Sequence, residues 1–571
     1  MNAVTPTLCR FALAAMVFLL FLAAVGHGAP ADVDYAPVVA EVEQLVKAEL
    51  DRGILTGVSV ALVSDQRIVF AEGFGWADEA TRRPATRQTI YRAGSISKLF
   101  TALSAMQLVE RGVLELDRPV NTYCPDFRIV VPFEDADPIT LRQLMCHRSG
   151  LVRESPVGGY FDPGEPSVSE TVASLADCVL VHRPNTKTKY SNIGVTVVGH
   201  VVSKVSGQPF SAYARDHLLK PIGMTGSAFL ADQAVREHLA TSYMQVADGR
   251  GGFRRIESPV FELGTLPAGN LYTSAEDLGR FLVFLFAAGT VEGKPLIKPE
   301  SLETMFTPQL VEAESGFGLG FHVGRFRDYK QVSHTGAVYG FSSSLTAVPE
   351  LKVGVVVLAN EDIATGPVRK LSAAALERMA DARLNIAAAP EVALASAEPP
   401  EVKPYLGGYE SESYWARIES HGGQLTAVVS GQRLVLTAID ADEYSADGRW
   451  ATDSPVEFAR DDDGRVSGFE ALGQTFRRVD PQAVPPVPDA WREFLGSYGP
   501  DFIPLVVSIK HGHLYAMTEN MVDYRLTPLN RTVFKMPPGM YEDEQLVFQV
   551  GPDGSVHGTV LAGMILRRTD P

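Results

Sequence analysis

Ser95 and Lys98 stand three positions apart at the start of a long apolar segment. From Ile96 to Val109 apolar residues recur mostly at helical spacing, and Gly112 is placed to end a helix. Side chains three residues apart share a helix face, so the amine of Lys98 would lie one turn from the hydroxyl of Ser95. A serine hydroxyl needs a neighbour that takes its proton, and a buried lysine with a lowered pKa can do this. The pair predicts nucleophilic catalysis, although an N-cap serine and a snorkelling lysine on an ordinary core helix have the same spacing.

A phenol and an amide precede a second apolar segment. Tyr190 and Asn192 follow a turn-forming stretch that starts at Pro184, and the apolar residues of 193–201 come next, ending near Gly207. This pattern predicts a helix with both side chains at its entrance. The alternatives are a buried tyrosine, an asparagine cap, and a buried strand in place of the helix, since β-branched residues dominate the run.

A third polar group, His334-Thr335-Gly336, lies in a strand-like segment. Two further strand-like segments follow at 341–349 and 353–360, which predicts consecutive antiparallel strands. Gly336 would let a ligand approach the backbone of the first strand. The alternative for His334 is a histidine whose hydrogen bonds are satisfied within the strand.

The remaining elements of the first 385 residues predict a mixed α/β domain over residues 36–385. Helical spacing marks 38–53, 139–146, 274–286 and 366–385, and strand-like alternation marks 58–63 and 67–74.

The last third of the chain repeats itself. Three segments match in the same order at separations of 89 or 90 residues: 406–409 with 495–498, 463–468 with 553–558, and Arg477-Arg478 with Arg567-Arg568. Such a period predicts two tandem all-β modules, at 404–480 and 489–571, after an Ala-, Pro- and Glu-rich linker at 386–403. Small antiparallel sheets of this size usually close into barrels or half-barrels.

Bulk properties exclude several classes of function. A formal charge of −17 over 571 residues argues against a nucleic-acid partner. Residues 1–31 resemble a secretory signal peptide, so we expect a secreted or periplasmic protein that contacts a membrane only if this segment stays uncleaved. Removal of the signal leaves Cys124, Cys146 and Cys178, which form no disulfide framework or zinc pattern, so no metal or cofactor is expected. Cys146 beside His147 could suggest a thiol nucleophile, but a core cysteine is the preferred interpretation.

The order Ser95-x-x-Lys98, Tyr190-x-Asn192 and His334-Thr335-Gly336 resembles the serine β-lactamase and penicillin-binding-protein family. Flanking phrases at 139–144, 147–150 and 268–271 add to the likeness, which covers roughly 36–385 and is closest to the branch of class C β-lactamases, DD-peptidases, D-aminopeptidases and esterases. The resemblance implies an α/β (α+β) β-lactamase-like domain with an antiparallel sheet and a helical region, followed here by two small β-barrel modules.

The same resemblance implies roles for the motif residues. Ser95 would attack a carbonyl and form an acyl-enzyme, while Lys98 and Tyr190 relay its proton, whichever of them is the formal base, and Asn192 binds a substrate amide or orients Lys98. The backbone amides of Ser95 and Ala337 would form the oxyanion hole, and Thr335 and Gly336 would contact the substrate.

One residue departs from the family pattern. Where β-lactamases and DD-peptidases usually carry lysine, this chain has His334, whose ordinary pKa of about 6.5 leaves it mostly neutral at pH 7. This favours neutral esters, amides or amine-bearing substrates over molecules with a free carboxylate. The family's D-aminopeptidases share the histidine and the plan with two β-barrel domains.

We therefore expect a secreted serine hydrolase of D-aminopeptidase type that acts on a small molecule or short peptide. A carboxylesterase, or a β-lactamase or DD-peptidase of the same mechanism, is the close alternative. A non-hydrolytic penicillin-binding receptor is another. The β modules could mediate homo-oligomerisation.

Overall fold

The computed structural model describes residues 33–247, 252–310, 314–387 and 401–569. The expected signal peptide and most of the expected linker lie outside these ranges. Among the described residues, no helix has the length and apolar character needed to cross a bilayer.

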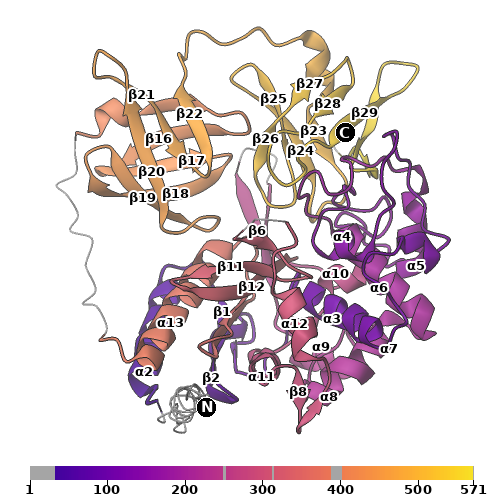
Figure 1. The fold of residues 1–571 in the computed structure, drawn as a ribbon. Helices are drawn as coiled ribbons and strands as arrows, with labels where there is room; N and C mark the ends of the chain where they lie inside the picture. The colour runs from indigo at the N-terminus through magenta and orange to yellow at the C-terminus, as the bar shows by residue number, and fades with distance from the viewer. Residues whose placement is uncertain (1–32, 248–251, 311–313, 388–400, 570–571) are drawn as a thin grey trace, which may run out of the picture.

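An antiparallel eight-stranded sheet forms the centre of the first domain (Figure 1). Its middle strands are buried along their whole length because helices cover both faces. Helices α2 (Ala36–Asp51) and α13 (Thr365–Leu384) pack together on one face, and α11 (Ala275–Phe286) packs on the other. In spatial order the strands are β10 (Gly316–Phe317), β11 (His322–Phe326), β12 (Tyr329–Val338), β13 (Phe341–Val348), β14 (Val353–Ala359), β1 (Gly57–Ser64), β2 (Arg67–Asp78) and β3 (Arg83–Pro84).

A helical region lies beside the sheet and contains the longest apolar helices. Helix α3 (Ser97–Glu110) is buried over most of its length and contacts α6 (Asn192–Ser206), which ends at the left-handed Gly207 as the sequence predicts. The other helices are α4 (Leu141–Met145), α5 (Val168–Ala173), α7 (Phe210–Ala214), α8 (Lys220–Ile222), α9 (Gln233–His238), α10 (Leu266–Gly269) and α12 (Pro299–Met305). Three small two-stranded sheets join β4 (Tyr91–Arg92) to β7 (Tyr272–Thr273), β5 (Tyr243–Ala247) to β6 (Phe253–Glu257), and β8 (Thr290–Val291) to β9 (Lys294–Pro295).

The first C-terminal module is a closed barrel of eight antiparallel strands. The strands are β15 (Gly407–Glu410), β16 (Trp415–His421), β17 (Gln424–Val429), β18 (Gln432–Asp440), β19 (Glu443–Gly448), β20 (Ser454–Arg460), β21 (Val466–Ala471) and β22 (Gln474–Arg478).

The second module has two sheets where the first has one barrel. A four-stranded sheet contains β23 (Gly496–Tyr498), β24 (Leu505–Lys510), β25 (His513–Met517) and β26 (Asp523–Arg525). A five-stranded sheet contains β27 (Thr527–Pro528), β28 (Val533–Lys535), β29 (Gln545–Val550), β30 (Val556–Leu561) and β31 (Met564–Arg567). A single bridge between Tyr498 and Arg568 links the two sheets.

The internal repeat is visible as a shared set of hydrogen bonds. Tyr409 and Tyr498 each donate a hydroxyl hydrogen bond to the carbonyl four residues earlier, at 2.6 and 2.7 Å. Arg478 and Arg568 each bond two backbone carbonyls beside that tyrosine's strand. The matched residues found in the sequence therefore fix the same corner in both modules.

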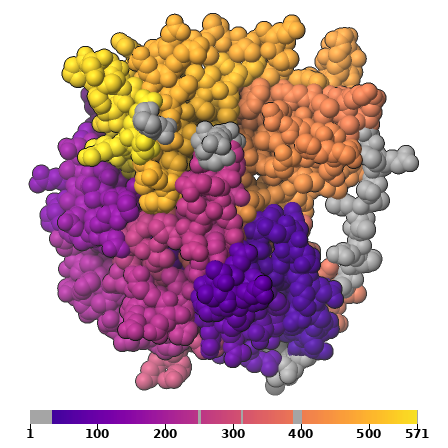
Figure 2. Space-filling view, turned by 180° about the vertical axis from the view of Figure 1, so that it is seen from behind, coloured from indigo at the N-terminus to yellow at the C-terminus, as the bar shows by residue number. Residues whose placement is uncertain are grey.

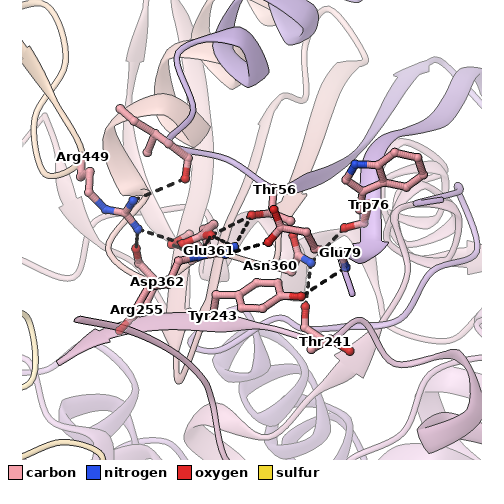
Figure 3. Close-up of polar contacts among 12 residues, drawn as sticks. Thr56, Trp76, Glu79, Thr241, Tyr243, Arg255, Asn360, Glu361, Asp362 and Arg449 are labelled. Carbon is pink, nitrogen blue, oxygen red and sulfur yellow. Dashed lines mark hydrogen bonds and ion pairs between the residues drawn. The ribbon is translucent and has the colours of Figure 1, made fainter. Parts of the chain in front are cut away.

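The two modules make different polar contacts with the first domain. Figure 2 shows the C-terminal residues of the second module (yellow) packed directly on the helical region (purple). The barrel instead inserts Arg449 next to α13, where its guanidinium donates to Glu361 Oε2 at 3.0 Å and to the Asp362 carbonyl at 2.7 Å (Figure 3). Arg255 and Thr56 also bond Glu361.

The predicted architecture is confirmed: an α/β domain with an antiparallel sheet and a helical region, followed by a C-terminal barrel. The segment after Asn192 is a helix and not a strand. Its burial against α3 and α4 explains why β-branched residues are tolerated there.

Candidate active site

Ser95 lies in the turn between β4 and α3, with Lys98 in the first turn of the helix behind it. The Lys98 Nζ is 2.9 Å from the Ser95 Oγ and donates a hydrogen bond to the Ala268 carbonyl at 2.8 Å. Lys98 is 1% exposed, whereas Ser95 is half-buried and accessible. The structure thus places a reachable hydroxyl against a buried amine.

Burial determines the protonation of Lys98. Desolvation lowers its pKa well below the ordinary value, with Glu154 opposing this effect and Arg153 adding to it. The neutral amine has a lone pair that can accept the Ser95 proton. Lys98 can therefore act as a base near neutral pH.

Tyr190 covers the other side of this pair. Its ring centroid lies 4.9 Å from the Lys98 Nζ, and its hydroxyl is hydrogen-bonded to Ser95. Burial raises the pKa of Tyr190 to about 12, so the phenol keeps its proton at pH 7. Of the two candidate bases that the sequence leaves open, the electrostatics favour Lys98, with Tyr190 as a proton donor or relay.

His334 projects from β12 toward the same group, its ring 6.4 Å from that of Tyr190. Its Nδ1 lies 2.6 Å from the Thr335 carbonyl and carries the proton that bonds it. Desolvation and the nearby Lys98 lower the pKa of His334 to about 3. The imidazole is consequently neutral throughout the usual pH range and offers no positive charge to a substrate carboxylate.

Strand β12 also brings Ala337 against the turn that precedes Ser95. A Cβ added to Gly94 would lie 2.8 Å from the Ala337 nitrogen, so the two backbone segments nearly touch. Gly94 has a φ of +54°, which a glycine adopts easily. The backbone amides of Ser95 and Ala337 are thus on adjacent segments, as an oxyanion hole requires.

Thr335 and Gly336, the expected substrate contacts, have different surroundings. Thr335 is exposed, whereas Gly336 is buried. A Cβ on Gly336 would lie 2.0 Å from the Ala93 carbonyl oxygen. The close approach expected of a ligand is therefore made by the chain itself, and the glycine is needed for packing β12 against the nucleophile turn.

Asn192 leads to a residue that the sequence patterns did not reveal. Its Nδ2 donates a hydrogen bond to Glu154 Oε1 rather than to Lys98. Glu154 is fully buried, and desolvation raises its pKa to about 7 although Arg153 opposes the shift. A carboxylic acid that titrates near neutral pH thus lies beside the predicted catalytic residues.

Arg153 ties this acid to the second C-terminal module. Its Nε is 3.6 Å from Glu154 and 3.7 Å from Glu519, and its guanidinium lies over the rings of Tyr190 and Tyr541. Burial opposes its charge, but the two carboxylates outweigh that effect and hold its pKa above the ordinary value. No local motif marks this cluster, because its members come from distant parts of the chain.

His147 is a further residue of the site that sequence reasoning considered only as a neighbour of Cys146. Its ring stacks on Tyr190 at 4.3 Å, and its Nδ1 accepts the backbone N–H of Ser191. The sequence signal that could have pointed to His147 was its place in the family-like segment 147–150. Burial raises the pKa of the Cys146 thiol to about 11, which disfavours a thiol nucleophile.

One cluster of metal-binding side-chain types occurs in the described residues: Cys124, Asp126 and His200, with ligand atoms within 4.8 Å of one another. The ammonium of Lys204 lies 2.9 Å from Asp126 and already neutralises this carboxylate. The cluster shares no residue with the Ser95 group.

Comparison with known proteins agrees with this geometry. The family described as Beta-lactamase matches residues 42–380. Protein flp of Staphylococcus aureus strain MW2 is 25% identical over 323 residues, which are 56% of this chain and 62% of that protein. A human beta-lactamase-like protein is 27% identical over 396 residues, 65% of this chain and 74% of its own length. This chain thus spans less than two thirds of the first of these relatives.

Solved structures share the fold. An octameric penicillin-binding protein homologue from Pyrococcus abyssi superposes with a TM-score of 0.54 at 22% identity, covering 85% of this chain and 99% of that one. D-amino acid amidase from Ochrobactrum anthropi SV3 gives 0.52 at 21% identity, covering 61% and 99%. Given the match over 42–380, this chain belongs to the beta-lactamase family of serine hydrolases.

Proposed function

We propose that this protein hydrolyses an amide or ester through an acyl-enzyme on Ser95. The observation that carries the proposal is the 2.9 Å contact between Ser95 Oγ and the amine of Lys98, whose pKa burial lowers. Lys98 takes the hydroxyl proton while the Oγ–carbon bond forms, and the backbone amides of Ser95 and Ala337 stabilise the oxyanion. The leaving group departs with a proton from the Lys98–Tyr190 pair, and water then hydrolyses the ester.

For the substrate we favour a D-aminopeptidase-like preference for a molecule with a free amine. His334 stays neutral, and the Asn192 side chain donates a hydrogen bond to the buried carboxyl group of Glu154. An ammonium group suits such surroundings better than a carboxylate does. A neutral ester is the second candidate, because an uncharged His334 does not discriminate against it.

Secretion and self-association complete the proposal. The apolar segment within residues 1–31 supports export to the periplasm or beyond. The octameric state of the Pyrococcus homologue supports a test for homo-oligomers in solution.

The decisive experiment compares wild type with Ser95→Ala and Lys98→Met on D-alanine p-nitroanilide, p-nitrophenyl acetate and nitrocefin. We expect turnover of the first two by wild type and losses of roughly 10³-fold or more in both variants. Ser95→Ala with undiminished activity contradicts the mechanism. Preferential turnover of nitrocefin contradicts the substrate assignment but leaves the mechanism intact.

Lys98→Met has a second expected result. Lysine is charged in the unfolded chain below pH 10.5, and burial lowers the pKa of Lys98 in the folded protein, so folding releases a proton between the two pKa values and the native state is disfavoured as the pH falls through that range. Methionine has a similar shape and no such cost. The inactive variant should therefore melt a few degrees above wild type at pH 7, measured by calorimetry, and the difference should shrink toward pH 10.

A further inference from the structure

The second C-terminal module places side chains among the loops that carry the site. Glu519 lies in the loop between β25 and β26, and residues 541–544 lie between β28 and β29. Both loops contact the first domain, through Glu519 on Arg153 and Glu544 on Lys189. Tyr541 donates its hydroxyl to Glu519 Oε1 at 3.0 Å, so the two loops are joined beside Arg153.

Glu544 holds two active-site loops with one oxygen atom. Its Oε1 lies 2.7 Å from the Lys189 Nζ and accepts the backbone N–H of Arg153 at 2.9 Å. The side chains of Glu544 and Lys189 are 1% and 5% exposed, so little water can replace either partner. The Lys189 Nζ also donates to the Glu542 carbonyl at 2.8 Å.

The two held residues directly precede residues of the site. Lys189 is followed by Tyr190, which bonds Ser95, and Arg153 is followed by Glu154, which bonds Asn192. A displacement of either backbone would move these groups relative to the Ser95 Oγ. Misplacement by about 1 Å can reduce a reaction rate by roughly 10²-fold.

We propose that Glu544 is a positioning residue through which the second module clamps the Tyr190 and Glu154 loops and makes the hydrolase site competent. The catalytic part of this inference rests on the proposed function. The clamp itself is a property of the fold and has its own readout.

Neighbouring Glu542 provides a matched control. Its carboxylate pairs with Lys187 at 2.8 Å, but these side chains are 34% and 40% exposed. The Glu542 side chain thus has the same charge, lies on the same loop and faces the same basic segment, but it is not buried, and only the backbone carbonyl of Glu542 bonds Lys189. Exposed ion pairs of this kind are screened by water and contribute little to the stability of the protein.

The experiment measures kcat, KM and the pH profile of Glu544→Gln, Glu544→Asp and Glu542→Gln with p-nitrophenyl acetate. We expect Glu544→Gln to lower kcat roughly 10- to 100-fold with KM within about twofold of wild type. Glu544→Asp, which keeps the charge on a shorter stem, should recover part of the loss. Glu542→Gln should stay within about twofold of wild type.

The acid limb of the pH profile separates positioning from simple destabilisation. Lys98 is faced by Tyr190, His334, His147, Arg153 and Glu154. If the clamp loosens and water enters, the desolvation of Lys98 weakens, so the limb should move to higher pH in Glu544→Gln. Wild-type kcat and an unmoved limb in a folded Glu544→Gln protein overturn the proposal.

Hydrogen exchange gives a readout that needs no activity. Amides of residues 151–154 and 186–191 should exchange faster in Glu544→Gln than in wild type or Glu542→Gln; equal rates overturn the clamp. Lys189→Met repeats the test from the other partner if Glu544→Gln folds poorly. Should wild type and Ser95→Ala be equally inactive on all substrates, the proposed function fails while exchange still decides the clamp.

Discussion

The two C-terminal modules share a repeat, yet they contact the catalytic domain in different ways. The first places Arg449 on Glu361 at the end of β14, beside α13 and within a network of Thr56, Arg255 and Asp362 (Figure 3). The second places Glu519 and Glu544 on Arg153 and Lys189, next to Tyr190. The first contact supports the sheet, whereas the second reaches the nucleophile's neighbours.

The residues common to both modules are not those that make these contacts. In each module these residues are one tyrosine, Tyr409 or Tyr498, and one arginine, Arg478 or Arg568. Their hydrogen bonds to backbone carbonyls hold the strands of the module together. The contacts come from loops or strand ends that the repeat does not share. The repeat thus keeps the tyrosine–arginine hydrogen bonds in both modules, whereas the loops differ and make the contacts with the first domain.

The largest effect should come from Arg153→Ala, on the side of the second module. This change leaves the buried Glu154 and Glu519 without their cation, which typically costs about 3–5 kcal/mol. It also removes the guanidinium from the Tyr190 ring, so activity should fall as well. Chemical denaturation and kcat measured on the same sample check both effects. A stable and fully active variant would contradict the inference that the second module, unlike the first, supports the active site.

Next in size is the pH dependence of stability. Burial raises the pKa of Asp362 to about 7 beside the first module, and that of Glu154 to about 7 beside the second. A carboxyl group with a raised pKa binds more protons when folded, so its contribution to stability is lost as the pH rises from about 4 to about 7. The loss is about 1.4 kcal/mol for each pH unit that separates the folded pKa from the unfolded pKa.

Asp362→Asn and Glu154→Gln should each reduce the decrease in the free energy of unfolding between pH 4 and pH 8, measured by urea denaturation. Only Glu154→Gln should also change the pH profile of kcat/KM. An altered kinetic profile in Asp362→Asn would show that the first module also acts on the site.

Arg449→Ala should have a smaller effect, about 1–3 kcal/mol, because Glu361 keeps Arg255 and Thr56 as partners. Its kcat should equal that of wild type, in contrast to Arg153→Ala. A melting curve and a single assay at saturating substrate test this expectation.

The smallest effect should be the same in both modules. Tyr409→Phe and Tyr498→Phe each remove one buried hydroxyl bond to a backbone carbonyl, which costs about 1 kcal/mol. We expect equal losses of stability and no loss of activity. Unequal losses would mean that the closed barrel of the first module and the two sheets of the second depend to different degrees on this hydrogen bond.

Local patterns in the sequence were sufficient for much of the catalytic group. Ser95 and Lys98 are one helical turn apart, so their spacing predicts their contact before any packing is known. The tandem modules follow from matched segments at one period. The order of Tyr190 and His334 predicts their roles only through the family likeness, since nothing local brings them to Ser95.

Tertiary structure alone decided the rest. Glu544 bonds the backbone of Arg153 across 391 positions, and no spacing rule reaches that far. The lowered pKa of Lys98 and the raised pKa of Glu154 depend on desolvation and on charges nearby in space, which exist only after the chain has packed. The sequence by itself determined which chemical groups are present and which neighbours meet within a turn; the fold determined their protonation and the loops that hold them.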